Sequence, residues 1–443
     1  MESNFPGFDK DVTMDNREDY LSFKDLLAEK AVGANSANEC LRYLTYYVEF
    51  FEDNHTKMQT EPGERIDESS AESINHFLSS EEFLQTEMVA LSSKQKVKGY
   101  AVDDIRGVYV SSDDTYTVAL IESRTDFRDY VAVIVDSKTR LWKKGQVKFE
   151  IKRKKGNIYE GFFYNRYHQA TYETSVAFDD GFLGNWWIKE SKSNKTNHSL
   201  NFDQEFYYSV MDSAVILRIP SFMEQYTHTI DSLYTAAKPA IEAHRYLLID
   251  VRNNGGGNSS NFSDLIPYLY TKPIIDTETV EFYATEDNIR LYAEAFDLIM
   301  QDSAQVNAET IEAFREAIDK MEGAEPNSFV GEGVADTLVL SAKPLPQKVG
   351  IIYNRGCASA CEDLLFIAKH SDKTLLLGDN SGGFVGYGNV FTTYTPCYGF
   401  GLSCSTTRYR TQWAYEVIGI APDIRLDYDY EWLGQALTIL KND

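Results

Sequence analysis

The chain has 443 residues, which is long for a single hydrophobic core, so two or three domains are expected. Its formal net charge of −25 argues against a nucleic-acid-binding protein and against adhesion to anionic membranes, because both need clustered lysine and arginine. No apolar run approaches the roughly 18 residues that a membrane span requires.

Neither the N-terminal sequence nor the cysteine content determines the cellular compartment. Residues 1–19 lack the basic region and apolar core of a signal peptide, but a leader removed before this numbering begins would leave the same sequence. Of the five cysteines, Cys397 and Cys404 flank a glycine-containing turn between expected strands. This spacing is compatible with a hairpin disulfide and equally with free thiols.

Residues 1–96 are predicted to form a helical domain. Apolar residues recur at helical spacing in three stretches, at 20–31, 39–51 and 73–91. The second stretch ends in the polar turn 52–56, which contains His55. Such a turn exposes side chains at the edge of a domain.

Residues 97–202 are predicted to form a β-rich module. Short runs alternate apolar and polar residues and are separated by Gly, Asp and Ser, a pattern typical of antiparallel strands. The polar stretch 189–199 ends the module and is typical of a linker. The strand-like runs lie at 107–112, 115–123, 130–137, 145–152, 159–168 and 170–178.

Residues 203–443 are predicted to form an α/β domain. A strand, a glycine-containing turn and a helix follow one another twice, which indicates strands of one sheet covered by helices. A charged helical segment at 293–323 separates the two units. The first unit covers 246–251, 252–258 and 260–270, and the second covers 348–353, 356–362 and 364–370.

The second turn, GCASACE, contains Ser359 at the start of an apolar helix. Ser-x-x-Glu before an apolar run predicts a capping box between Ser359 and Glu362. A serine at a helix N-terminus is also placed where the helix dipole favours an alkoxide-like transition state. The two interpretations do not exclude each other. Cys361 is a further candidate nucleophile, although small buried residues are expected around a tight turn.

The first turn has three consecutive glycines, Gly255 to Gly257, directly after a buried strand. Glycines let the backbone approach a ligand closely and present N–H groups that suit a phosphate or a developing oxyanion. The phosphate-binding motifs GxGxxG and GxxxxGK[ST] are absent from the sequence. A plain tight turn is the alternative.

A nucleophilic serine needs a base, and the chain has seven histidines. His370 lies on the helix that Ser359 opens, roughly 16 Å further along its axis, and cannot serve. His55 is the candidate, because its polar turn lies at a domain edge. A structural role is favoured for the histidines inside the expected helices and strands, which are His76, His168, His198 and His228.

Three segments together resemble the tail-specific or carboxyl-terminal processing peptidases, peptidase family S41. They are IDVRNNGGG at 249–257, ASACED at 358–363 and EVIGIAPDI at 416–424, and the resemblance covers residues 40–56 and about 210–430. It implies a crotonase-like α/β catalytic domain that acts on peptides or polypeptides without metal or cofactor. The whole chain is then a multidomain α/β protein with an N-terminal helical domain and an inserted β-rich module.

The family has two catalytic styles. The Ser–Lys style places a lysine 25 residues after the serine, where this chain has Phe384, and the segment 378–388 contains no lysine. The tricorn-like style takes a histidine from an Asp-Gly-His-Thr-like turn and a glutamate just before Gly-x-x-Pro-Asp. By this resemblance His55 and Glu416 complete a triad with Ser359, although Asn54 stands where Gly or Ser is commoner.

The resemblance also implies an oxyanion hole formed by the N–H groups of Gly256 and Ala360. We therefore expect a serine endopeptidase or carboxyl-terminal processing-type peptidase that forms an acyl-enzyme. By likeness to bacterial members it is extracytoplasmic, that is periplasmic or secreted, with or without a lipid anchor on a removed leader. The β-rich module lacks the carboxylate-binding loop of a PDZ domain, so specificity for a free carboxyl terminus is not implied.

A second hypothesis comes from another functional class. A catalytically inactive relative could bind a peptide or a hydrophobic ligand without cleaving it. Phe384 and Asn54 keep this hypothesis open, whereas the retained Ser359, His55 and Glu416 favour catalysis. The oligomeric state is not indicated by the sequence.

Overall fold

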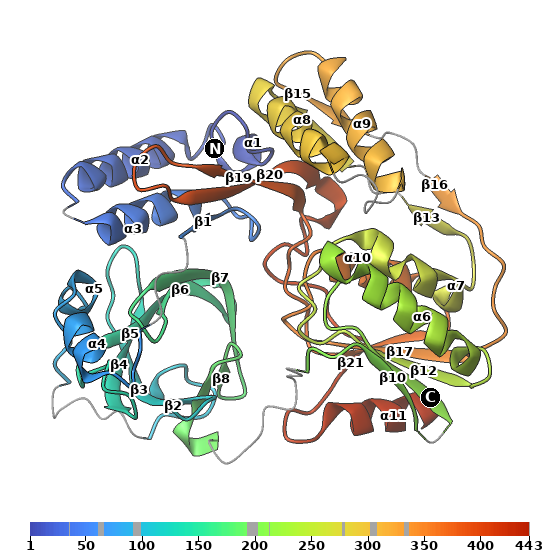
Figure 1. Ribbon diagram of the computed structural model, residues 1–443, viewed down its shortest axis with the longest axis horizontal. Helices are drawn as coiled ribbons and strands as arrows, with labels where there is room; N and C mark the ends of the chain where they lie inside the picture. The colour runs from blue at the N-terminus through green and yellow to red at the C-terminus, as the bar shows by residue number, and fades with distance from the viewer. Residues whose placement is uncertain are drawn as a thin grey trace.

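The computed structural model describes residues 1–443 except 35, 61–65, 92–98, 193–202, 212, 277–279, 302–307, 332–335 and 443. It is a mixed α/β multidomain architecture, as expected (Figure 1). The predicted domain limits at 96 and 202, most of the predicted linker and His198 lie outside the described residues. No helix in the described part of the chain is both long and apolar enough to cross a membrane.

The N-terminal segment is helical, as predicted. Helix α3 is capped by Ser36, whose side chain accepts a hydrogen bond from Glu39 N–H, and its apolar side packs into the core. The turn after α3 carries His55 and leads into strand β1 (Lys57–Gln59). The helices of this segment are α1 (Phe8–Asp11), α2 (Arg17–Val32), α3 (Ala37–Val48), α4 (Ala71–Phe77) and α5 (Glu81–Leu84).

The β-rich module is a closed barrel of consecutive antiparallel strands. Alternating residues of these strands fill its interior, among them Tyr109, Phe149 and Trp187, so the barrel has a packed core. The six predicted strands are present, and two short strands that were not predicted close the barrel. Its strands are β2 (Gly107–Ser111), β3 (Tyr116–Glu122), β4 (Tyr130–Ser137), β5 (Val147–Lys155), β6 (Ile158–Tyr164), β7 (Ala170–Asp179), β8 (Phe182–Leu183) and β9 (Trp187–Lys189).

A six-stranded sheet forms the centre of the C-terminal part, in the order β10-β11-β12-β17-β18-β21. Its strands from β11 onward run parallel, and the inner strands β11, β12 and β17 are buried on both faces, which explains their continuous apolar runs. The strands are β10 (Tyr207–Met211), β11 (Ala214–Arg218), β12 (Tyr246–Asp250), β17 (Lys348–Tyr353), β18 (Thr374–Gly378) and β21 (Ile424–Arg425).

Helices cover both faces of this sheet (Figure 1). One face packs against α6 (Thr227–Ile241), α7 (Ile266–Leu269) and α10 (Ala360–Lys369), and the other packs against α11 (Trp432–Asn442). Because β12 and β17 are parallel neighbours, the two glycine-containing turns leave the same edge of the sheet side by side.

A second sheet joins the two ends of the chain, in the order β1-β20-β14-β15 with β19 paired to β20. The pairing of β1 with β20 holds the residues just after His55 against the strand that leads to Glu416. The remaining strands are β13 (Ile274–Asp276), β14 (Val280–Ala284), β15 (Ser328–Gly331), β16 (Asp336–Leu338), β19 (Tyr387–Tyr394) and β20 (Gly401–Tyr409). The predicted helical segment at 293–323 contributes to two helices, α8 (Glu286–Gln301) and α9 (Ala308–Glu322).

Candidate active site

The two glycine-containing turns are bound to each other. Asn253 N–H donates to Asn354 Oδ1 (2.9 Å), and Asn354 Nδ2 donates back to Asn253 Oδ1 (2.7 Å). At Gly256 a Cβ would lie 2.5 Å from the carbonyl oxygen of Ala358 and 2.9 Å from Ser359 Cβ, so only glycine fits. The first turn therefore packs directly against Ser359 in the second turn.

Ser359 is the N-cap of α10 and adopts φ 54° and ψ −124°. A positive φ is costly for a non-glycine residue and recurs at catalytic nucleophiles on sharp strand-to-helix turns. Glu362 N–H lies 2.6 Å from the main-chain oxygen of Ser359, and the Glu362 carboxylate accepts a hydrogen bond from Ser359 N–H (3.0 Å). These two contacts anchor the cap through its main chain, which is compatible with a reactive hydroxyl.

A disulfide joins Cys357 to Cys361 and straddles Ser359. Both cysteines are fully buried, and the bridged Cys361 has no thiol to compete as a nucleophile. Cys397 and Cys404, the pair left open by the sequence, are free thiols. The hairpin register explains this, because Cys404 lies opposite Phe391 in β19 while Cys397 lies in the connecting loop.

The buried Glu362 carboxylate also holds the Gly-rich segment that follows β18. It accepts hydrogen bonds from Ser381 Oγ (2.5 Å), Gly383 N–H (2.9 Å) and Phe384 N–H (2.8 Å). Burial raises the pKa of Glu362 against the effect of these donors. Since Ser359 N–H and Phe384 N–H share Oε2 of this carboxylate, Phe384 is fixed next to the Ser359 turn.

His55 lies beside Phe384, with the two rings 5.3 Å apart between centroids and nearly perpendicular. The ring atom Nδ1 of His55 is 3.6 Å from Asp53 Oδ1, and the main-chain N–H of His55 donates a hydrogen bond to the same oxygen (2.9 Å). Burial alone would lower the pKa of His55, but Asp53 and then Glu416 outweigh it, so the pKa is raised above its usual value. Asp53 is the nearest carboxylate, and sequence reasoning missed it although it lies in the same turn.

Glu416 is buried and fixed by three main-chain donors: Asn54 N–H (3.1 Å), Val385 N–H (2.9 Å) and Gly386 N–H (2.7 Å). Burial and then the charge of Asp53 raise its pKa to about 7. Glu416 thus connects the His55 turn to the Gly-rich segment, and its charge reaches the imidazole over a longer distance than that of Asp53.

The predicted residues gather in one region but are not all engaged as predicted. Among the residues that the structure describes, no hydrogen bond joins Ser359 Oγ to the His55 ring, and Phe384 contacts that ring. Gly256 N–H donates a hydrogen bond to Asn254 Oδ1 (2.9 Å). This bond must break before the same N–H can donate to an oxyanion. Ala360 N–H belongs to the first turn of α10 and lies beside Gly256, at the positive end of the helix dipole.

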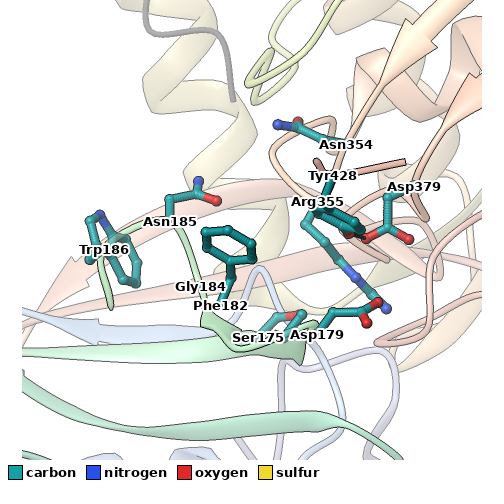
Figure 2. A pocket seen from close by; sticks show the side chains of 11 residues that line it. Ser175, Asp179, Phe182, Gly184, Asn185, Trp186, Asn354, Arg355, Asp379 and Tyr428 are labelled. Carbon is teal, nitrogen blue, oxygen red and sulfur yellow. Dashed lines mark hydrogen bonds between the residues drawn. The ribbon is translucent and has the colours of Figure 1, made fainter. Parts of the chain in front are cut away.

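A pocket opens between the rim of the barrel and the sheet edge that carries these turns (Figure 2). Asn354 and Arg355 line it from the segment just before Ser359, and Asn185 and Trp186 line it from the barrel. Phe182 and Tyr428 stack across it, with ring centroids 6.0 Å apart. The barrel therefore contributes directly to the surroundings of the site.

Comparison with known proteins identifies the region around this site. Residues 213–426 match the model of peptidase family S41, which includes Gly256, Ser359 and Glu416 and excludes His55 and the barrel. No curated protein sequence matches the chain.

Several solved structures are remotely similar. Mature CPAF is 11% identical, with 100% of this chain and 95% of that chain covered and a TM-score of 0.49. The photosystem II D1 C-terminal processing protease is 12% identical, with 100% and 94% covered and a TM-score of 0.36. A lipoprotein from Streptococcus agalactiae is 18% identical, with 54% and 71% covered and a TM-score of 0.32.

The contact of His55 with Asp53 makes a prediction about protonation. We expect His55 to titrate above its ordinary pKa of about 6.5, because Asp53 favours the imidazolium. In Asp53→Asn this attraction is lost while burial remains, so the pKa of His55 falls below that of the native protein. NMR titration of the ring protons measures both values. The exposed Asp67→Asn is the control, and an unchanged pKa in Asp53→Asn would contradict the assignment.

The disulfide makes a prediction about stability. The bridge closes a loop with a sequence separation of 4, so replacing both Cys357 and Cys361 by Ala should lower the free energy of unfolding by about 2 kcal/mol. Urea denaturation measures this, with the free cysteines Cys40→Ala and Cys397→Ala together as control. Alkylation of the unfolded, unreduced protein should modify only Cys40, Cys397 and Cys404; modification of all five would exclude the bridge.

Proposed function

We propose that this chain, whose residues 213–426 match the model of peptidase family S41, is a serine-type peptidase that hydrolyses peptides or unfolded polypeptides through an acyl-enzyme on Ser359. The observation that carries this proposal is the placement of Ser359. It combines a positive φ, an adjoining glycine turn and a helix N-terminus with a histidine turn held nearby through Phe384 and Glu416. We further propose that the α/β part is crotonase-like and that residues 1–96, 97–202 and 203–443 form separate domains.

In the proposed mechanism Ser359 Oγ attacks the substrate carbonyl while His55 takes the hydroxyl proton. His55 then gives the proton to the leaving amine, and a water activated by the same imidazole hydrolyses the ester. Asp53 and Glu416 stabilise the imidazolium that forms in each half of the reaction. For this transfer the His55 ring and the Ser359 hydroxyl must approach within hydrogen-bonding reach, which apo sites often do only when substrate is bound.

The tetrahedral oxyanion would be stabilised by Ala360 N–H and by the Gly256 turn. Gly256 N–H becomes available if the Asn254 side chain moves to another partner. The dipole of α10 favours the same negative charge. Loss of one such donor typically costs about 10²–10³-fold in rate, so this rearrangement matters for the chemical step.

The disulfide also bears on where the protein works. A fully buried bridge next to the nucleophile is typical of proteins from oxidising compartments. This supports the proposal that the peptidase is extracytoplasmic.

Labelling with a fluorophosphonate probe tests the function. We expect the native protein to react and Ser359→Ala not to react, and His55→Ala to be slowed about 10⁴-fold or more. Glu416→Gln should be slowed much less, because Asp53 lies nearer to His55 and still stabilises the imidazolium. His370→Ala, at the exposed end of α10, is the control. If the folded native protein does not react, the proposal fails, and ligand extracted from the purified protein would then support an inactive relative that binds a peptide or hydrophobic ligand.

The pocket of Figure 2 makes a prediction about substrate binding. Trp186 is 41% exposed and offers an aromatic face to an extended chain that passes the barrel rim. Trp186→Ala should raise the KM for denatured casein about 5- to 10-fold, the effect of losing roughly 1–1.4 kcal/mol. The rate of fluorophosphonate labelling should not change, because the small probe does not need the pocket. Tyr398→Ala, at an exposed loop, is the control; equal KM values would exclude the pocket from binding.

A further inference from the structure

Lys154 of barrel strand β5 is buried against the turn that carries His55. Its side chain is 8% exposed, and its Nζ lies 3.4 Å from Asn54 Oδ1, to which it donates a hydrogen bond. It also donates to the carbonyl oxygen of Thr174 in β7 (3.3 Å). One ammonium group therefore joins the barrel to the residue directly before the candidate base.

Two buried carboxylates share this ammonium group. Glu160 of β6 lies 3.1 Å from Nζ, and Glu49, at the end of α3, lies 3.7 Å from it. Burial raises the pKa of Glu49 to about 8 although Lys154 opposes this. For Lys154 burial lowers the pKa, but Glu49, Glu160 and the more distant Glu416 outweigh it. The lysine thus stays charged in a place where an unpaired ion would be costly.

Asn54 links Lys154 to the candidate site. It is fully buried, its N–H donates to Glu416 Oε1 (3.1 Å), and its Nδ2 donates to the carbonyl oxygen of Gly383 (2.9 Å), next to Phe384. Lys154 sets the orientation of the Asn54 side-chain amide. An ammonium group can only donate hydrogen bonds, so the amide oxygen Oδ1 must face it. With Oδ1 held by Lys154, Nδ2 is directed at the Gly-rich segment.

We propose that Lys154 is a positioning residue, which holds Asn54 and thereby sets His55 in place for the reaction at Ser359. The proposal rests on the function proposed above. It makes the barrel a part of the catalytic apparatus in addition to its contribution to the pocket. A displacement of about 1 Å at a reacting group can slow a reaction about 10²-fold, so the contact matters even though Lys154 touches no substrate.

The experiment compares variants that keep or remove the contact. Lys154→Met alone leaves Glu49 and Glu160 without their cation and can fail to fold. The combined variant Lys154→Met, Glu49→Gln, Glu160→Gln has no charged group in this cluster, so it avoids the cost of burying unpaired carboxylates. Lys152→Met, an exposed lysine of the same strand, is the matched control.

We expect the combined variant to unfold at a temperature close to that of the native protein and to react with the fluorophosphonate probe about 10- to 100-fold more slowly. For denatured casein its kcat should fall while its KM is unchanged. Adding Asn54→Ala should slow it by less than the sum of the two separate effects, because both changes remove the Lys154–Asn54 contact and only the bond of Asn54 to Gly383 is lost in addition. A native labelling rate in the combined variant, or fully additive effects with Asn54→Ala, would overturn the proposal.

Hydrogen exchange separates this proposal from the proposed function. The amides of residues 52–56 should exchange at least about tenfold faster in the combined variant and at the native rate in Lys152→Met. If the native protein does not react with the probe, the proposed function fails, and the exchange measurement alone decides whether Lys154 holds the turn. Unchanged exchange at 52–56 would then exclude it.

Discussion

The candidate site depends on two buried carboxylates that bind main-chain N–H groups from segments far apart in sequence. Glu362 ties the amide of Ser359 to those of Gly383 and Phe384, and Glu416 ties Asn54 to Val385 and Gly386. A carboxylate in a buried place costs free energy unless several donors satisfy it, so each one specifies its partners closely. The Gly-rich segment 381–386 is therefore held from both sides, by the Ser359 turn and by the His55 turn.

This arrangement explains why a segment without any lysine can still belong to the site. In the Ser–Lys style of the resembling family the segment would supply the base itself. Here it supplies main-chain donors and the Phe384 ring, and the candidate base His55 lies in the turn after α3. The pairing of β1 with β20 adds a second constraint, because it fixes the chain immediately after that turn.

The sequence was informative wherever a feature is local. Apolar alternation predicted six of the strands that form the barrel, and the strand–glycine–helix pattern predicted an α/β domain with Gly256 and Ser359 in its strand-to-helix turns. It did not reveal the closure of the barrel by β8 and β9, which are only two and three residues long. Asp53, the Cys357–Cys361 bridge and Lys154 were also missed. Their roles depend on distances across the fold, and residue type or spacing alone does not encode those distances.

The region that matches the family model, residues 213–426, contains the Ser359 turn, the glycine turn and Glu416 but no candidate base. His55 reaches this region from outside it, through Asn54, and Asn54 is contacted in turn by Lys154 of the barrel. Of the donors to Glu416, one belongs to that outer part of the chain. The region that matches the family model therefore contains only part of the candidate site, and the turn after α3, which Lys154 of the barrel contacts, supplies the other part.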